Sequence, residues 1–274
     1  MSETPNLQKE ESNISNKVLS QIDKFTGTGE IQMPPNYSPA NAIKGAWIIL
    51  GDQVDRSQKP VLEACTNASI ASALFKMCME GLSAIKGQGY FIPYGTKLTW
   101  MRDYNGSRAL AKRVGNVKDV PANVVFEGDE FEYGVDPQTG YQYLITHKPN
   151  PKGRDMSKIQ GAYAMVVYND GRVNLEYMTF DEIQTAWQQG ATKGKSPAHQ
   201  KFPQEMCKKT VIQRACKEPI NSSDDSYLLN VNDESYNDTE DATHIDVTDE
   251  VDNETGTKKI EFENPEKTPT EPTY

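Results

Sequence analysis

Apolar side chains recur at helical spacing in several stretches of this chain. Between residues 66 and 80, the side chains of Ile70, Leu74, Met77 and Cys78 fall on one face of a helix, which predicts that this face is buried. The same reasoning, with a cap or a closing glycine at the ends, predicts further helices. They are expected at residues 38–50, 104–114 and 204–217, with another opening at the capping box of Thr179 and Glu182.

Other stretches are rich in aromatic and β-branched residues and predict strands. Residues 88–94 and 97–102 surround Gly95 and predict a hairpin, and Asn169-Asp170-Gly171 predicts a tight turn between two later strands. The further strands are expected at residues 117–126 (bent at Pro121 or lying at a sheet edge), 129–134, 141–147, 159–168 and 171–178. Together these elements predict an α+β fold, a curved antiparallel β-sheet with flanking helices.

Composition divides the chain into three parts. Residues 1–37 are polar and broken by glycine and proline, which predicts a flexible N-terminal arm. Residues 38–220 carry the periodic patterns and form the predicted core, in which residues 188–200 are expected to be a mobile loop. Residues 221–274 are dominated by Asp, Glu, Asn, Ser and Thr, which predicts an acidic disordered tail.

Charge follows the same division. The whole chain has a net charge of −10, which at first argues against nucleic acid. Residues 81–219, however, carry 19 basic and 14 acidic side chains, whereas residues 220–274 carry 3 basic and 16 acidic ones. A basic middle followed by an acidic tail is typical of DNA-binding proteins whose tail competes with DNA or recruits partners. A globular domain with a solvated tail is the alternative interpretation.

Cysteine spacing and hydropathy point to the cytoplasm. Cys65, Cys78, Cys207 and Cys216 form no CxxC pair and lie in predicted helices, so we expect them to be reduced and buried. The first twenty residues contain no apolar run, and no stretch approaches about 18 consecutive apolar residues. The sequence therefore predicts neither a signal peptide nor contact with a membrane.

Basic side chains cluster on two predicted helices and near the first hairpin. In the helix at residues 104–114, Arg108 and Lys112 are four residues apart and share a face that differs from the apolar one. The predicted phosphate contacts are Lys97, Arg102, Arg108, Lys112, Arg113, Lys208, Lys209 and Arg214. Two ordinary amphipathic helices with solvated faces are the alternative.

Aromatic residues accompany these basic ones. Tyr94, Trp100 and Tyr104 are candidates for stacking with bases, a sequence-tolerant contact that suits single strands. The alternative is that they form the core of the sheet. Tyr90 shares a strand face with Tyr94 and is itself a candidate for the core.

An enzymatic alternative rests on Glu127, Asp129 and His147, which could hold a metal ion beside a scissile phosphate in a nuclease. The carboxylates cluster at one turn, however, which favours a structural role. No GxxxxGK[ST] loop occurs, so ATP-driven strand transfer is not expected. The sequence predicts no catalytic residue and no metal site.

Five sequence blocks follow one another in a characteristic order. They are Ser69–Leu82 with Gly89–Gly95, Tyr104–Gly115, Val124–Phe131 (which contains Glu-Gly-Asp-Glu-Phe), Leu144–Pro149 and Met206–Arg214. Together they resemble the RecT family of phage and prophage annealing proteins. Three positions depart from the family pattern: Asp103 replaces a Gly, Asn105 replaces a Lys or Arg, and Gln213 replaces a basic residue. The first two departures put a phosphate contact beside Tyr104 in doubt.

The resemblance implies a function. Members of the family bind single-stranded DNA and nascent duplex, assemble into rings or helical filaments, and anneal complementary strands during recombination without ATP. No cofactor is required, and Mg²⁺ would enter only with the DNA. The acidic tail would suit contacts with a partner exonuclease or the host single-strand binding protein.

Overall fold

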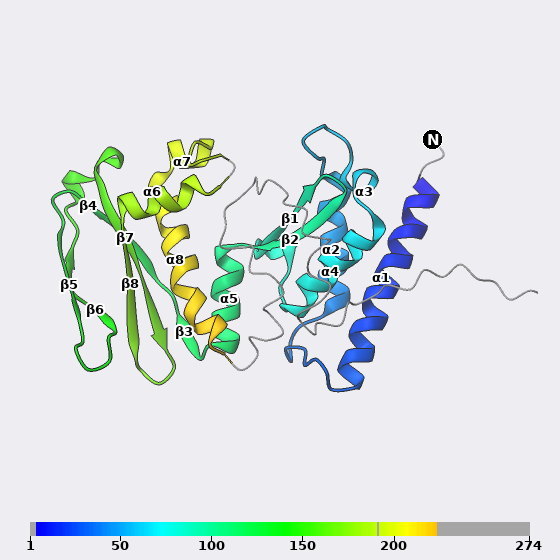
Figure 1. Cartoon of the computed structure of the whole chain (residues 1–274), viewed down its shortest axis with the longest axis horizontal. Helices are drawn as coiled ribbons and strands as arrows, with labels where there is room; N and C mark the ends of the chain where they lie inside the picture. The colour runs from blue at the N-terminus through cyan, green and yellow to red at the C-terminus, as the bar shows by residue number, and fades with distance from the viewer. Residues whose placement is uncertain (1–3, 191, 224–274) are drawn as a thin grey trace, which may run out of the picture. The chain divides into compact units, whose positions relative to one another are not determined.

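The computed structural model describes residues 4–190 and 192–223 (Figure 1). Its α-helices are α1 (Thr4–Gly27), α2 (Pro39–Asp52), α3 (Val61–Ala64), α4 (Asn67–Met79), α5 (Tyr104–Val114), α6 (Phe180–Gln188), α7 (Pro197–Lys201) and α8 (Pro203–Asn221). Its strands are β1 (Gly89–Tyr94), β2 (Lys97–Arg102), β3 (Val117–Asp119), β4 (Ala122–Phe126), β5 (Glu130–Val135), β6 (Gln142–Lys148), β7 (Ile159–Tyr168) and β8 (Val173–Thr179). The predicted α+β class is confirmed.

The N-terminal segment differs from the prediction of a flexible arm. Helix α1 occupies most of residues 1–37, and it buries Ile14, Val18 and Ile22, which recur every four residues. The indole nitrogen of Trp47 on α2 also donates a hydrogen bond of 2.7 Å to Ser15 Oγ. The polar composition of the segment concealed this narrow apolar stripe.

Helices α2 and α4 begin where the caps predicted. Ser38 accepts a hydrogen bond from the Asn41 backbone and is followed by Pro39 at the first helical position. Thr66 caps α4 in the same way through the Ser69 backbone N–H. Gly81 follows α4 with φ of +58°, a conformation that favours glycine.

The strands form three antiparallel sheets rather than the single curved sheet that we predicted. Strands β1 and β2 pair with each other, with Tyr94 opposite Lys97. Strand β7 is the central strand of the largest sheet and pairs with β3, β4 and β8. The predicted strand at residues 117–126 is divided at Pro121, which cannot donate to a ladder. Strands β5 and β6 form a separate hairpin.

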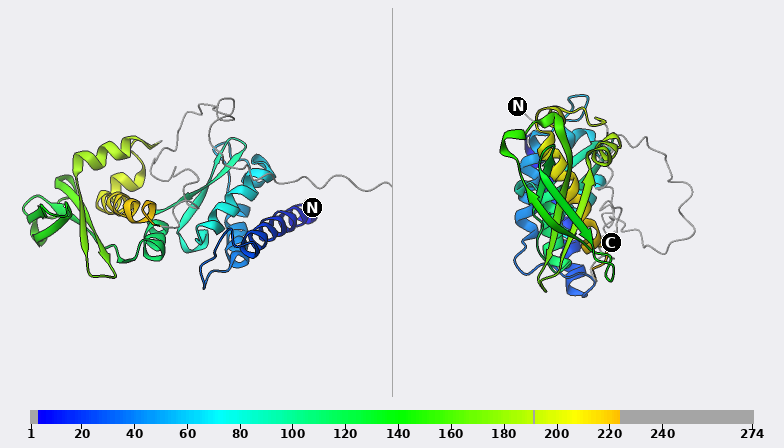
Figure 2. Two further views of the ribbon diagram at one scale, coloured as in Figure 1. Left: turned by 60° about the horizontal axis from the view of Figure 1, so that its bottom comes forward. Right: turned by 90° about the vertical axis from the view of Figure 1, so that its left-hand side faces the viewer.

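Helices α5 and α8 cover the β7 sheet with one apolar cluster. Leu110 on α5 and Val211 on α8 are fully buried in it, together with Val120 and Ala164 from the sheet region. The two helices pack side by side, as Figure 2 shows. The β5–β6 hairpin packs through Phe131 and its neighbours against a smaller cluster on the other strands. The core therefore fixes α5 and α8 relative to each other.

The last described elements extend beyond the predicted boundaries. Residues 188–200, expected to be a mobile loop, contain the start of α7, which Ser196 caps through the His199 backbone. Helix α8 continues to Asn221 and includes Pro219. The predicted acidic tail lies outside the described residues from 224 onward, as do residues 1–3 of the predicted arm. No helix within the described ranges is long and apolar enough to cross a membrane.

The four cysteines are free and buried, as predicted. Burial raises the pKa of the Cys207 and Cys216 thiols to about 12 and that of Cys78 to about 11. These thiols are therefore neutral near pH 7 and pack as small apolar side chains.

Candidate nucleic-acid interface

The N-terminus of α5 lies close against the β1–β2 hairpin. The Asp103 backbone N–H donates to the carbonyl of Gln88 at 3.0 Å. A Cβ at position 106 would lie 2.0 Å from that same carbonyl oxygen, so glycine is required there for the approach. This contact fixes the first turn of α5, and with it the direction of the basic side chains that follow.

A buried carboxylate, Glu80, holds the hairpin to the end of α4. Its oxygens accept a hydrogen bond of 2.7 Å from the indole nitrogen of Trp100 and one of 3.3 Å from Arg102 Nη1. The side chains of Arg102 and Glu80 are 7% and 6% exposed. Arg102 also donates to Ser107 Oγ on α5 at 3.2 Å. Glu80 and Arg102 thus connect the end of α4, strand β2 and helix α5.

Three predicted DNA contacts are therefore corrected. Trp100 is 1% exposed and packs on Phe91, with ring centroids 5.0 Å apart, so it has no free face for a base. Arg102 is buried in its ion pair with Glu80, so its guanidinium is not accessible to a phosphate. Arg113 is exposed, but its guanidinium donates to the backbone carbonyls of Glu80 and Gly81, which makes it part of the same junction.

Lys209 on α8 meets α5 and β1 at one point. Its Nζ lies 3.1 Å from Asp103 Oδ1, an ion pair without hydrogen-bond geometry, and 5.8 Å from the centre of the Tyr90 ring. Tyr90 is 37% exposed, contrary to the expectation that it belongs to the core. The core face of the hairpin is instead that of Phe91 and Trp100, which are opposite each other in the register. A cation beside an exposed ring is the pair that a single strand would use.

Further along α5, Arg108 and Lys112 share one acceptor. Arg108 Nη2 and Lys112 Nζ lie 3.4 Å and 2.7 Å from Asp119 Oδ1 on β3. The hydrogen bond from Lys112 lowers the pKa of the Asp119 carboxyl below its usual value. The predicted common face of these two basic residues is confirmed.

The remaining basic residues do not join this group. Arg214 pairs with Glu176 on β8 at 2.7 Å, and Lys208 pairs with Glu205 within α8 at 2.6 Å. Lys209 and Arg214 differ by about 140° around the helix, from the 3.6 residues per turn. The prediction that all these groups converge in a single trough is therefore wrong, because α8 presents them on different faces.

The other predicted residues lie near the interface without completing it. Lys97 is exposed at the tip of the hairpin. Tyr94 is half-buried, with its hydroxyl 3.5 Å from Met101 Sδ. Tyr104 is half-buried against the main apolar cluster. The arrangement that remains is a row of α5 side chains, Arg108 and Lys112, with Lys209 and Tyr90 at the start of the helix.

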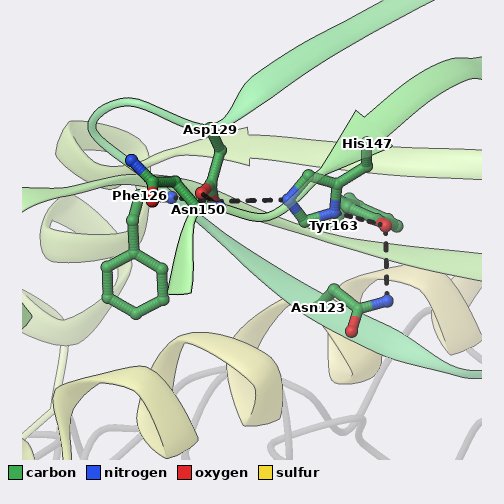
Figure 3. A network of polar contacts seen from close by, with 6 residues as sticks. All are labelled: Asn123, Phe126, Asp129, His147, Asn150 and Tyr163. Atoms are coloured by element: carbon green, nitrogen blue, oxygen red, sulfur yellow. Dashed lines mark hydrogen bonds and ion pairs between the residues drawn. The ribbon is translucent and has the colours of Figure 1, made fainter. Parts of the chain in front are cut away.

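Two of the three residues of the nuclease alternative, Asp129 and His147, form a polar network with Tyr163 on β7 (Figure 3). His147 Nε2 lies 3.3 Å from Asp129 Oδ2, and His147 Nδ1 lies 3.0 Å from the hydroxyl of Tyr163. Asp129 also accepts backbone hydrogen bonds from Phe126 and Asn150 at 2.9 and 2.7 Å. Its side chain is 1% exposed.

This geometry indicates a structural role for the block Glu127–Phe131. Both oxygens of Asp129 are engaged by donors, whereas Glu127 forms an exposed ion pair with Lys158 at 2.8 Å. Gly128 between them has φ of +88°, as the turn requires. Within the described part of the chain, no group of three or more His, Cys, Asp or Glu side chains is placed to hold a metal ion.

Acid should weaken this network. Burial alone would raise the pKa of Asp129, but the N–H groups of Asn150 and Phe126 and the His147 ring outweigh it, so the pKa lies below the ordinary 3.8. The resulting stabilisation is present above pH 3.8 and is lost as the pH falls through the lower folded value. We expect Asp129→Ala to reduce the free energy of unfolding at pH 7 by about 2–3 kcal/mol. Urea unfolding of the variant and of the unaltered chain at pH 7 and near pH 3 checks this. If the difference in unfolding free energy between the two proteins does not shrink in acid, the prediction is contradicted.

The fold and the site together define a mixed α+β protein with basic and aromatic side chains gathered where two helices meet a β-hairpin. The family model of the RecT family matches residues 40–254 of this chain. Protein RecT of Escherichia coli (strain K12) is 29% identical over 170 residues, which cover 58% of this chain and 60% of that protein. The chain thus matches less than two thirds of the length of this relative. Since the family model covers most of the sequence, the chain belongs to the RecT family.

Proposed function

We propose that this chain binds single-stranded DNA and anneals complementary strands in recombination, without ATP and as an oligomer. The observation that supports this most strongly is the placement of Lys209 beside the exposed ring of Tyr90 at the start of α5, with Arg108 and Lys112 further along the same helix. Such side chains bind the phosphate backbone and stack with bases without reading the sequence. Base pairing between the two strands then supplies the specificity.

The basic groups are held by carboxylates in the DNA-free protein. Asp103 faces Lys209, and Asp119 faces Arg108 and Lys112. A phosphate that binds here takes the place of these carboxylates, so the pairs keep long side chains positioned while DNA is absent. We propose further that a partner exonuclease and the host single-strand binding protein contact the acidic C-terminal tail, and that the protein acts in the bacterial cytoplasm. No cofactor is needed, and Mg²⁺ arrives only with the DNA.

Annealing is tested directly with two complementary oligonucleotides, one carrying a fluorophore and the other a quencher. The full chain should accelerate quenching in the absence of ATP, and the rate should not change when ATP is added. A folded protein that binds neither strand, or that leaves the rate at its spontaneous value, would overturn the proposal. Cleavage of the labelled DNA in the presence of magnesium would instead favour the nuclease hypothesis.

Two substitutions at one ion pair should change DNA affinity in opposite directions. Lys209→Ala should weaken binding to a labelled single strand and reduce the salt slope by roughly 0.7 of a log unit. Asp103→Asn should tighten binding, because it removes the carboxylate that competes with phosphate for Lys209. Fluorescence anisotropy over a range of salt concentrations measures both.

A charge-matched control separates this contact from the net charge of the protein. Lys59→Ala removes an exposed positive charge from the loop between α2 and α3 and should leave the salt slope unchanged. The double substitution Arg108→Ala and Lys112→Ala should reduce the slope by about twice the amount seen for Lys209→Ala. Equal slopes in all the variants would show that DNA binds elsewhere.

A further inference from the structure

One exposed apolar surface lies where α2 meets the short 3₁₀ helix Ala84–Lys86. Ile48 and Ile85 are 65% and 59% exposed. The side chain of Ile85 lies over Gly45, three residues before Ile48 on α2, so the two isoleucines share a surface. Lys44 and Lys86 flank them and are exposed. We call Lys44, Ile48, Ile85 and Lys86 the helix face.

A second exposed apolar surface covers the outer side of the β5–β6 hairpin. Tyr143 and Ile145 are 47% and 50% exposed, and the Tyr143 ring lies over Gly134 on the neighbouring strand. Glu132 is exposed and lies on the same side of β5 as Gly134, because the register shift leaves the extra residue, Ile145, on β6 and does not interrupt the alternation of β5. We call Glu132, Tyr143 and Ile145 the hairpin face.

The two faces complement each other. Single exposed apolar residues are ordinary, but each of these surfaces pairs two large ones and has a net charge at its border. On the helix face, Lys44 and Lys86 outnumber the one carboxylate of Asp52, which lies four residues after Ile48. On the outer side of the hairpin, Lys148 pairs with Glu130, so the net charge there is that of the Glu132 carboxylate. Among the strands of the described ranges, β5 pairs with β6 alone, so its other edge is open to a neighbouring molecule.

We infer that the hairpin face of one copy docks on the helix face of a second copy. The two surfaces differ, so this contact is heterologous and repeats from copy to copy, forming a ring if the rotation closes and a filament if it does not. This deepens the proposed function, since it identifies the partner surface of the oligomer. Neither face includes Arg108, Lys112, Lys209 or Tyr90, so the proposed DNA contacts do not take part in the assembly.

Charge reversal tests the contact in the full-length protein. Lys86→Glu and Glu132→Lys should each weaken self-association about tenfold or more, because like charges then face each other. Analytical ultracentrifugation or mass photometry over a range of concentrations, with and without a single-stranded oligonucleotide, measures this. Lys59→Glu reverses a charge outside both faces and should assemble like the unaltered chain.

Mixing the two defective variants provides the decisive result. In the mixture, the new carboxylate of the Lys86→Glu variant faces the new ammonium group of the Glu132→Lys variant. At the next contact the unaltered Glu132 of the first variant faces the unaltered Lys86 of the second, so alternating assemblies should recover. The chain carrying both substitutions should also assemble alone. Recovery cannot come from two misfolded proteins. If the single variants assemble normally, or if neither the mixture nor the double variant recovers, the inference is wrong.

Failure of this contact can be distinguished from failure of the proposed function. Affinity for an oligonucleotide short enough to occupy one copy should be the same in the two variants and in the unaltered chain, whereas assembly on long strands should differ. Loss of affinity for the short oligonucleotide in both single variants would place these faces at the DNA and overturn the inference. Absence of DNA binding in the unaltered chain would instead contradict the proposed function alone.

Discussion

Glu80→Ala is expected to lower the free energy of unfolding by about 3–5 kcal/mol, since removing one partner of a buried ion pair leaves the other charge uncompensated. Here the stranded charge is Arg102, and the Trp100 indole loses its acceptor as well. Chemical denaturation monitored by tryptophan fluorescence measures the change.

An exposed ion pair provides the matched control. Lys148 and Glu130 are 2.8 Å apart but 71% and 60% exposed, so Glu130→Ala should change the stability by less than about 1 kcal/mol. A loss at Glu80 as small as the loss at Glu130 would mean that the junction does not depend on this pair. Glu80→Gln should be intermediate, because the amide oxygen still accepts from Trp100 but no longer balances the guanidinium.

Gly106→Ala should be the most disruptive substitution in α5. The added Cβ would lie 2.0 Å from the Gln88 carbonyl oxygen and 2.7 Å from Arg102 Cγ, so α5 must move away from the hairpin. We expect a loss of about 1–3 kcal/mol or more from overpacking. Because Lys209 meets Asp103 and Tyr90 beside this turn, single-strand affinity should fall together with stability.

Gly51→Ala is the corresponding control in another helix. A Cβ there has nothing within 4 Å, so the substitution should stabilise α2 by up to about 1 kcal/mol through helix propensity. Thermal unfolding of the two variants should therefore shift in opposite directions. A Gly106→Ala protein that is as stable as the unaltered chain, with unchanged DNA affinity, would contradict the close approach.

Local sequence signals predicted most elements of the fold. The bounds of α5 follow from its apolar spacing and the closing Gly115, and the capping box at Thr179 forms with both of its hydrogen bonds. The break between β3 and β4 at Pro121 also follows from the chemistry of one residue. Helix α1 was missed because its buried residues, three among the side chains described from residue 11 onward, give a weak signal in a polar segment until α2 and α4 provide the surface that they pack against.

The candidate site was harder to predict, because tertiary contacts decide which of its residues are buried or paired and which remain at the surface. Alternation shows that Phe91 and Tyr90 point to opposite sides of β1, but it does not show which side is buried. That choice depends on Glu80, which lies 20 residues before Trp100 in the sequence and accepts a hydrogen bond from its indole N–H. Arg102 resembles any basic residue near a hairpin until its partner is known. In the same way, the ion pair with Glu176 shows that Arg214 lies on another face of α8, which its sequence position alone does not reveal.

Asp103, one of the three positions that depart from the family pattern, has a specific partner in the structure. A glycine at this position would leave Lys209 without this carboxylate, whereas the aspartate balances that lysine and makes no capping hydrogen bond to α5 through its side chain. The sequence identified the departure, and the contact from α8 explains which basic group it affects.

Asp119 serves two cations with one carboxylate. The three charges do not cancel, so this part of α5 retains an excess of one positive charge even with its contacts intact. If this chain binds single-stranded DNA as we propose, an approaching strand would be attracted before any internal contact is given up. Asp119 could then keep one of its two partners while the other turns toward the phosphate. Such stepwise exchange would let DNA be captured, shifted and released by small rearrangements, which is what the annealing of two strands requires.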